Sequence, residues 1–206
     1  MTIPSGYRVP AADIEVEEVI KGSRFITRIR NVATVAAAKN WLKTLREQEP
    51  TATHHCWAYI VGNPHSTTDL GCSDDGEPAG TAGKPMLNVL QHSHVGDLMA
   101  ICTRYYGGTK LGTGGLARAY GGGVKLAMEQ LTTCEKVVKV RLDATIDYDC
   151  GKDFEHLLQG HEGNILATDY GAQVNYQVEL PKHQQEELQQ QLEVRFGDKI
   201  QWKFTK

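Results

Sequence analysis

The 206-residue sequence has no apolar run that approaches the length of about 18 residues needed by a membrane-spanning helix. Its first residues lack a basic segment followed by an apolar core, so no secretory leader is expected. The five cysteines are odd in number, widely spaced and without a C-x-x-C pair, which disfavours a disulfide framework. Hydrophobic residues make up 40% and charged residues 23%, as in folded globular proteins. These features predict a cytoplasmic protein with reduced thiols and no membrane partner.

A strongly basic composition is also lacking. The net charge of −3 disfavours a generically basic nucleic-acid-binding protein. The charges are nevertheless segregated along the chain, because residues 69–77 contain four acids and no cation. Residues 98–128 contain no acid and four cations, which are Arg104, Lys110, Arg118 and Lys125. Two neighbouring segments of opposite sign predict either pairing with each other or a site that carries both charges.

Hydrophobic periodicity predicts two α+β domains, residues 1–134 and 137–206. In the first, strand patterns over 13–20, 24–32, 54–62 and 97–106 alternate with helical spacing over 34–48, 85–93 and 116–128. The composition then changes, since only five of the 21 glycines follow Val137. The second half indicates strand, helix, two strands, helix and strand. This βαββαβ order is typical of a ferredoxin-like domain.

The segment RYYGGTKLGTGGLARAY, residues 104–120, passes from an apolar strand into a helix. Glycines let a ligand approach the backbone closely, and free N–H groups at a helix start favour an anion. Cations add charge, and tyrosines offer faces on which bases stack. The alternative is a tight turn with close helix–sheet packing. The candidate phosphate- or nucleic-acid-binding residues are Arg104, Tyr105, Tyr106, Gly107, Gly108, Lys110, Gly112, Gly114, Gly115 and Arg118.

Two nucleotide-binding fingerprints do not fit this sequence. Residues 112–117 match G-x-G-x-x-A, but the acid expected about 20 residues later, Glu135, falls at the predicted domain boundary. The string GTAGKP shares only its Gly-Lys pair with a P-loop. Pro78 stands where the first glycine should be, and Pro85 replaces the magnesium-binding Ser or Thr. Neither a dinucleotide fold nor a P-loop is therefore predicted.

Potential metal ligands are present without a convincing arrangement. Asp74, Asp75 and Glu77 offer oxygen atoms to a hard cation, but in an Asp/Gly turn such carboxylates cap backbone N–H groups or pair with cations, and we favour that interpretation. His54 and His55 are adjacent on a predicted strand and point to opposite faces, so they cannot converge on one zinc ion. No catalytic residue, metal site or cofactor is predicted.

Four strings in this chain resemble signatures of the IMPACT family, over nearly the whole chain and most strongly over residues 20–130. They are KGSRFI (21–26), HHCWAYIVG (54–62), SDDGEPAGTAGKPML (73–87) and RYYGGTKLGTGGLARAYGGG (104–123). The third string makes a family motif loop of Ser73, Asp74, Asp75, Gly76, Glu77, Pro78, Gly80, Thr81 and Lys84. We expect this loop to pack beside the basic glycine segment, so that the two line one surface.

The resemblance implies a fold for each domain. The first is expected to resemble the second domain of a small-subunit ribosomal protein and domain IV of elongation factor G. The second is expected to be ferredoxin-like, as is domain V of that factor. Eukaryotic members regulate translation by competing for the activator of an initiation-factor-2 kinase, largely through an extra N-terminal domain. The family motifs here begin at Lys21, so that activity is not expected to carry over.

The resulting hypothesis is a translation-associated regulatory protein that binds RNA, the ribosome or translation factors through the glycine-rich basic surface of its first domain. The charge and the tyrosines motivate this hypothesis, together with the fold analogy to the elongation-factor domains, which is an association and not a physical argument. A first alternative is an enzyme acting on a phosphorylated small molecule or nucleotide with Mg²⁺, in which Arg104 holds phosphate and the acids of residues 74–77 hold the metal. A second alternative is a protein-docking module that does not bind nucleic acid.

Overall fold

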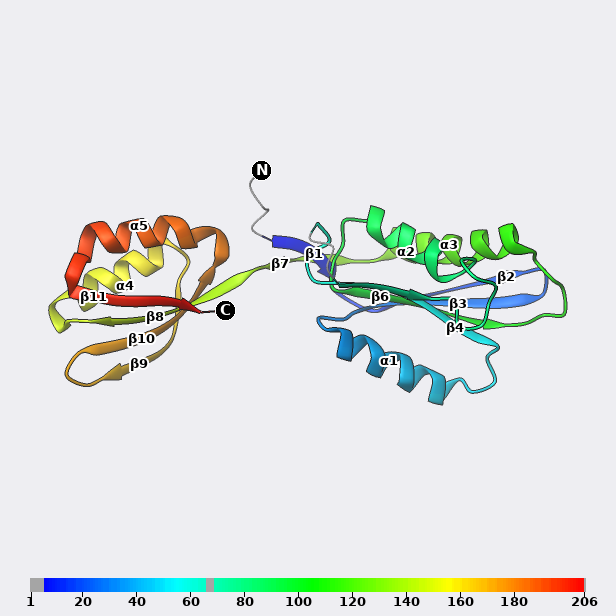
Figure 1. Cartoon of the computed structure of the whole chain (residues 1–206), viewed down its shortest axis with the longest axis horizontal. Coiled ribbons are helices and arrows are strands. Elements are labelled where there is room, and N and C mark those ends of the chain that lie inside the picture. The colour runs from blue at the N-terminus through cyan, green and yellow to red at the C-terminus, as the bar shows by residue number, and fades with distance from the viewer. Residues whose placement is uncertain (1–5, 66–68, 206) are drawn as a thin grey trace. The chain divides into compact units, whose positions relative to one another are not determined.

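The computed structural model describes residues 6–65 and 69–205, which form two compact units (Figure 1). The first unit is Tyr7–Lys136, and the second runs from Val137 and also includes Gly6. Each unit has its own apolar core and its own sheet. None of the described helices is long and apolar enough to cross a membrane.

The first unit is built on a five-stranded antiparallel sheet with helices on both faces (Figure 1). Helices α2 (Gly83–His92) and α3 (Thr113–Gln130) cover one face, and α1 (Val35–Gln48) packs on the other. In spatial order the strands are β2 (Ile14–Ile20), β3 (Ser23–Asn31), β6 (Leu98–Tyr105), β4 (His54–Val61) and β5 (Asp69–Ser73).

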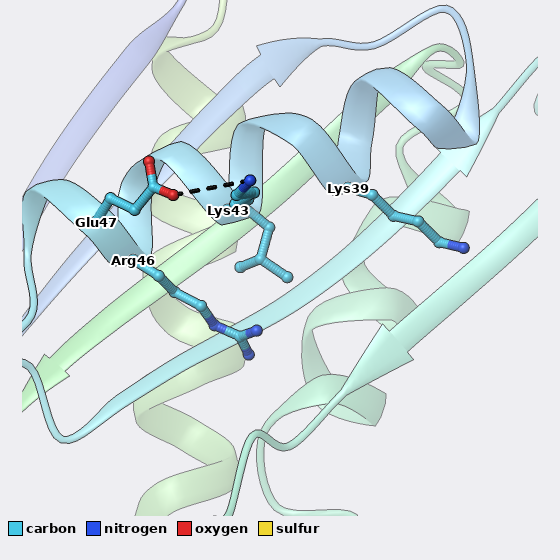
Figure 2. Close-up of a pocket in the computed structure, with 5 residues that line it drawn as sticks. Lys39, Lys43, Arg46 and Glu47 are labelled. Carbon is cyan, nitrogen blue, oxygen red and sulfur yellow. Dashed lines mark ion pairs between the residues drawn. The ribbon is translucent and has the colours of Figure 1, made fainter.

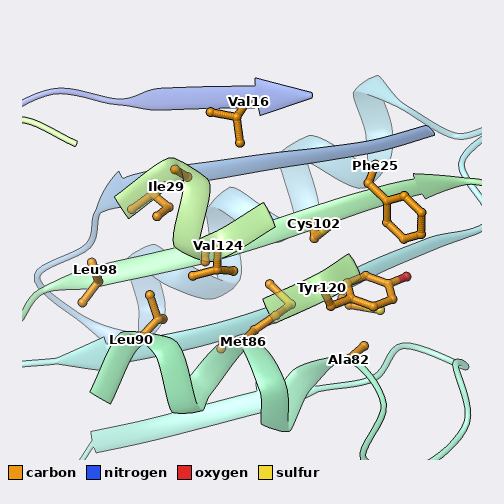
Figure 3. Packing of buried hydrophobic residues seen from close by; sticks show 14 of the residues in the cluster. Val16, Phe25, Ile29, Ala82, Met86, Leu90, Leu98, Cys102, Tyr120 and Val124 are labelled. Atoms are coloured by element: carbon orange, nitrogen blue, oxygen red, sulfur yellow. The ribbon is translucent and has the colours of Figure 1, made fainter. Parts of the chain in front are cut away.

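The central position of β6 explains its sequence. Because helices cover both faces of the sheet, β6 is buried along nearly its whole length, which is why its apolar run is continuous rather than alternating. Its side chains divide between two cores. Leu98 and Cys102 face α2 and α3, where Tyr120 packs edge-on against Phe25 (Figure 3). Met99 and Ile101 pack on the α1 side.

A two-stranded ribbon of β1 (Gly6–Pro10) and β7 (Thr133–Val137) lies where the first unit ends. It is tied to the five-stranded sheet through Asp97, whose side chain is only 2% exposed. That carboxylate accepts hydrogen bonds from Tyr7 Oη at 2.8 Å and Lys136 Nζ at 2.5 Å. A buried charge with two charged or polar partners strongly favours one geometry, so this cluster fixes where the chain leaves the unit.

The second unit has the predicted βαββαβ order. Its four-stranded antiparallel sheet has the spatial order β11-β8-β10-β9. Buried side chains alternate along β8 and β10 and pack against Phe154, Leu188 and Leu192 of the two helices. The elements are β8 (Lys139–Ile146), α4 (Gly151–Gly160), β9 (Asn164–Tyr170), β10 (Val174–Pro181), α5 (Gln185–Phe196) and β11 (Ile200–Thr205).

Candidate functional site

The family motif loop and the glycine segment meet at one end of the five-stranded sheet, where β6 ends and β4 begins. Arg104 Nη1 lies 2.6 Å from Glu77 Oε1, and both side chains are nearly fully buried. The phenolic hydroxyl of Tyr120 on α3 donates a hydrogen bond to the same Glu77 Oε1 atom at 2.7 Å. Burial raises the pKa of Tyr120, so this phenol stays protonated as a donor. The expected packing of the two segments is therefore present, and one buried glutamate joins them.

Arg104 has a different role from the one expected from the sequence. Its guanidinium lies inside the unit, between the rings of Phe25 and Tyr106, each 5.3 Å away. Nη2 donates to Ser23 Oγ at 3.3 Å, while Nε is buried and has no hydrogen-bond partner among the described residues. Because Glu77 already neutralises this charge in the interior, Arg104 positions the two segments and is not a surface contact for phosphate.

Asp74 closes the start of α2. Its carboxylate accepts backbone N–H bonds from Gly80 at 2.8 Å, Ala82 at 2.9 Å and Gly83 at 2.8 Å. Burial acts to raise the pKa of Asp74, but these three donors and the nearby Lys84 outweigh it and hold the pKa below its usual value. The carboxylate thus satisfies helix-start donors that have no partner within the helix.

Asp75 is also committed to protein contacts. Its carboxylate pairs with Arg46 on α1 and accepts from His55 N at 2.7 Å. Its own carbonyl lies 2.8 Å from His54 Nδ1. Within residues 6–65 and 69–205, no three His, Cys, Asp or Glu side chains are placed to hold a metal ion. The three acids of the loop therefore act as caps and ion-pair partners, which is the interpretation favoured from the sequence.

The thiols near the loop belong to the core. Cys56 and Cys102 face each other across β4 and β6 and are fully buried. Burial raises the pKa of Cys102 to about 12, and it raises the pKa of Cys56 as well. A protonated thiol is a poor nucleophile. Cys56 Sγ instead donates to the carbonyl of Asp74 at 3.0 Å, which helps to hold the family motif loop.

The glycines of the loop 107–112 serve two purposes. A Cβ on Gly107 would lie 1.9 Å from the carbonyl oxygen of Gly22, so this glycine is required for close packing of the β2–β3 turn. Gly108 and Gly112 have φ of 86° and 74°, which favour glycine whatever the available space. Beside this loop, Tyr106 is 48% exposed, whereas Tyr105 is half-buried and donates to Glu49 Oε2 at 3.0 Å.

The start of α3 is open, unlike that of α2. Its N-cap is Gly112, which has no side chain to satisfy the first N–H groups. Gly114 and Gly122 have nothing within 4 Å of where a Cβ would stand, and neither has a positive φ. At helical spacing they share one face with Arg118 and Lys125, and all four residues are exposed. We call this face, with the loop 107–112, the α3 surface.

A shallow depression lies along α1, on the opposite side of the sheet (Figure 2). It is lined by Lys39, Leu42, Lys43, Arg46 and Glu47, with Lys43 and Glu47 paired at 4.0 Å. The pattern of α1 predicted a helix, but nothing in it indicated this depression.

The sequence comparisons decide the family. A family model described as the Impact N-terminal domain matches residues 21–128, which is more than half of the chain. The chain belongs to the IMPACT family. A second model, described as a domain of unknown function (DUF1949), matches residues 145–199 in the second unit.

Relatives in the IMPACT family cover most of this chain. The "IMPACT family member YigZ" of Escherichia coli is 47% identical over 175 residues, or 85% of this chain and 86% of that protein. YvyE of Bacillus subtilis is 37% identical over 164 residues, 79% of this chain and 74% of its own. The "Protein IMPACT" of Xenopus laevis is 37% identical over only 93 residues, 44% of this chain and 29% of that protein.

A solved crystal structure of a hypothetical protein is 42% identical, with a TM-score of 0.73 and 97% of each chain covered. The chain therefore has a two-domain α+β architecture, in which an Impact N-terminal domain is followed by a second domain of helices and strands.

Sequence reasoning located the two family segments but missed part of what joins them. Ser23 was not singled out, although its hydroxyl accepts from Gly107 N at 3.1 Å and from Arg104. Its only signal is its place in the family string KGSRFI. Of the remaining motif residues, Thr81 Oγ1 donates to the carbonyl of Pro78 at 2.7 Å, and Lys84 is exposed on α2.

Proposed function

We propose that this protein is a non-enzymatic, translation-associated regulatory protein that binds RNA, on or off the ribosome, through the α3 surface. The observation that carries the proposal is the solvent face of α3, where Gly114 and Gly122 leave the helix backbone bare on either side of the exposed Arg118, and the exposed Lys125 follows Gly122 on the same face. Phosphate contacts supply most of the affinity of sequence-independent nucleic-acid binding.

Internal packing supplies no reason for these two glycines. A glycine inside a helix costs about 1 kcal/mol relative to alanine. Packing explains Gly123, because a Cβ there would lie 2.5 Å from Thr27 Oγ1. Gly122 and Gly114 have open space instead. A helix without side chains on one face allows a bulky partner to approach its backbone, and close approach to an external partner explains the glycines that packing does not.

Charge supports an anionic partner. No acid occurs between Leu98 and Met128, and Lys110, Arg118 and Lys125 are all exposed. The uncapped N–H groups that follow Gly112 add partial positive charge at the same end of the helix. Tyr106 offers a partly exposed ring next to the loop, on which a base can stack.

The proposal extends to the fold. The βαββαβ order and antiparallel sheet of the second unit support a ferredoxin-like fold. The motifs of the first unit support its likeness to the second domain of a small-subunit ribosomal protein and to domain IV of elongation factor G. Such fold analogies agree with contact between this protein and RNA. They are associations, however, and the proposal does not depend on them.

Binding to a purified transfer RNA and to ribosomes, measured over a range of salt concentrations, tests the proposal. We expect affinity to fall steeply with salt, by a slope of about 0.9 in log affinity per duplex phosphate contact. Arg118→Ala and Lys125→Ala should each weaken binding and lower that slope by about one contact. Lys152→Ala, which removes an exposed cation from the second unit, is the matched control.

If the unmodified protein binds neither RNA nor ribosomes at low salt, the proposal is wrong. Capture of a protein partner that is insensitive to salt and to ribonuclease would favour a docking module instead. The magnesium-dependent enzyme loses support from the structure, because Asp74, Asp75 and Glu77 are engaged by backbone N–H groups and by Arg46, Arg104 and Tyr120.

A further inference from the structure

The α1 side of the first unit carries a pair of stacked aromatic rings on strand β4. Trp57 and Tyr59 alternate along β4, are half-buried, and stack with ring centroids 5.6 Å apart and planes only 7° from parallel. A Cβ on Gly71 of β5 would lie 2.5 Å from the Tyr59 ring. Gly71 is therefore the residue that allows this ring to lie down across the neighbouring edge strand.

The depression along α1 lies on the same face of the sheet as this pair. Leu42, which lines the depression, belongs to the same apolar cluster as Trp57 and Tyr59, and α1 packs directly on β4. Helical spacing places Lys39, Lys43 and Arg46 on one edge of α1 (Figure 2). Lys39 and Lys43 are exposed, and the Lys43–Glu47 pair is 4.0 Å long with both side chains mostly in solvent. Such a pair contributes little, so the ammonium groups are available to an anion.

The opposite edge of α1 has no comparable arrangement. Trp41 projects there, but the Arg30 guanidinium lies 5.0 Å from its ring centroid and occupies that face. Arg30 is itself held by Asp13 at 2.6 Å. One edge of α1 is thus internally satisfied, whereas the other carries exposed cations on the face of the sheet that bears the two parallel rings.

From this arrangement we infer a second binding surface, which takes unpaired bases of single-stranded RNA. A base stacks on the Trp57–Tyr59 pair, and Lys39 and Lys43 contact the adjoining phosphates. Paired bases inside a duplex present no free face for such stacking, so the surface selects single strands. The inference does not rest on the α3 surface, which lies on the other side of the sheet.

Tryptophan fluorescence gives a direct test, because the chain has only three tryptophans. In a Trp41→Phe/Trp202→Phe background, Trp57 is the sole reporter. Titration with a single-stranded oligouridine should quench its emission, whereas a duplex RNA of the same length should not. Tyr59→Ala in this background should weaken oligouridine binding about 5- to 100-fold, as expected for loss of one stacked base.

Matched variants separate stacking, charge and the α3 surface. Trp41→Ala should leave oligouridine affinity unchanged. The Lys39→Ala/Lys43→Ala pair should lower the salt slope by about 0.7 per phosphate contact on a single strand. Arg118→Ala should weaken transfer RNA binding and leave oligouridine binding intact, so failure of either surface is visible separately.

Circular dichroism and thermal unfolding establish that each variant is folded, and Tyr59→Phe keeps the ring and should keep the affinity. Two results would overturn the inference. One is unchanged Trp57 emission at saturating oligouridine. The other is a folded Tyr59→Ala variant with unchanged affinity. Quenching of Trp57 by a protein partner but not by oligouridine would also overturn the inference, because it would show that this face binds protein.

Discussion

Helices α2 and α3 cover the same face of one sheet, yet their starts are built in opposite ways. At α2, Asp74 occupies the free N–H groups with a carboxylate, and the loop that carries it is anchored by Asp75 and Glu77. At α3, a glycine stands at the cap, glycines leave part of the helix bare, and exposed cations lie along it. The first start is capped by a carboxylate of the protein itself, whereas the second has a glycine cap without a side chain.

This difference divides the two family segments by role. The acidic segment is structural, although acids and glycines in a loop are a common signature of ligand sites. The basic segment contributes to structure through Arg104 and Gly107 and leaves Lys110, Arg118 and Lys125 in solvent. Glu77 connects the halves, because it holds both Arg104 and Tyr120 of α3.

The largest expected effect comes from removing that connection. Glu77→Ala leaves the Arg104 charge buried without its partner, and such a loss costs about 3–5 kcal/mol of unfolding free energy. Urea denaturation in a Trp202→Phe background, followed by the tryptophans of the first unit, measures it. Glu17→Ala is the control, since the Glu17–Arg24 pair is nearly half-exposed on both sides and its loss should change the unfolding free energy far less. Equal losses in the two variants would show that Glu77 does not join the segments.

A smaller effect is expected from opening α2. Asp74→Ala should cost about 0.5–2 kcal/mol, the range for loss of a helix-capping side chain. The same denaturation assay measures it, with the exposed Asp69→Ala as the control. If Asp74→Ala unfolds at the same urea concentration as the unmodified protein, the closed start of α2 is not a stabilising feature.

Acid dependence sharpens this test. Because the pKa of Asp74 is lower in the folded than in the unfolded protein, its contribution is fully present above the unfolded value, about 3.9. It is lost as pH falls through the folded pKa. Asp74→Asn should therefore flatten the fall in stability below about pH 4. An unchanged acid profile in Asp74→Asn would contradict the assigned role.

Much of this fold could be predicted from the sequence, because long periodic segments determine it. The strands missed were β1, β5 and β7, each of five residues. They are too short to show a period, and β5 contains Gly71, which reads as a turn residue but accommodates the Tyr59 ring. The βαββαβ order of the second unit was visible because its elements are longer and alternate regularly.

The site was only partly predictable. Opposite charges in neighbouring segments indicated either pairing or a shared site, and the structure shows pairing: Arg104 pairs inside with Glu77, while Arg118 is exposed. Arginine is seldom buried, so sequence alone favoured exposure for both. Likewise, the sequence does not distinguish the roles of the adjacent glycines Gly122 and Gly123. Only the distance from Gly123 to Thr27 shows that one is required by packing and the other is not.

The smallest expected change in stability gives the most direct test of the open α3 surface. Gly122→Ala and Gly122→Gln should raise the unfolding free energy by roughly 0.5–1 kcal/mol through helix propensity, while Gly123→Ala should lower it by steric conflict with Thr27. Transfer RNA affinity is measured on the same samples. We expect the Gly122 variants to be more stable yet to bind RNA more weakly, with glutamine weaker than alanine. Gly122 variants that are more stable and bind RNA as tightly as the unmodified protein would contradict it.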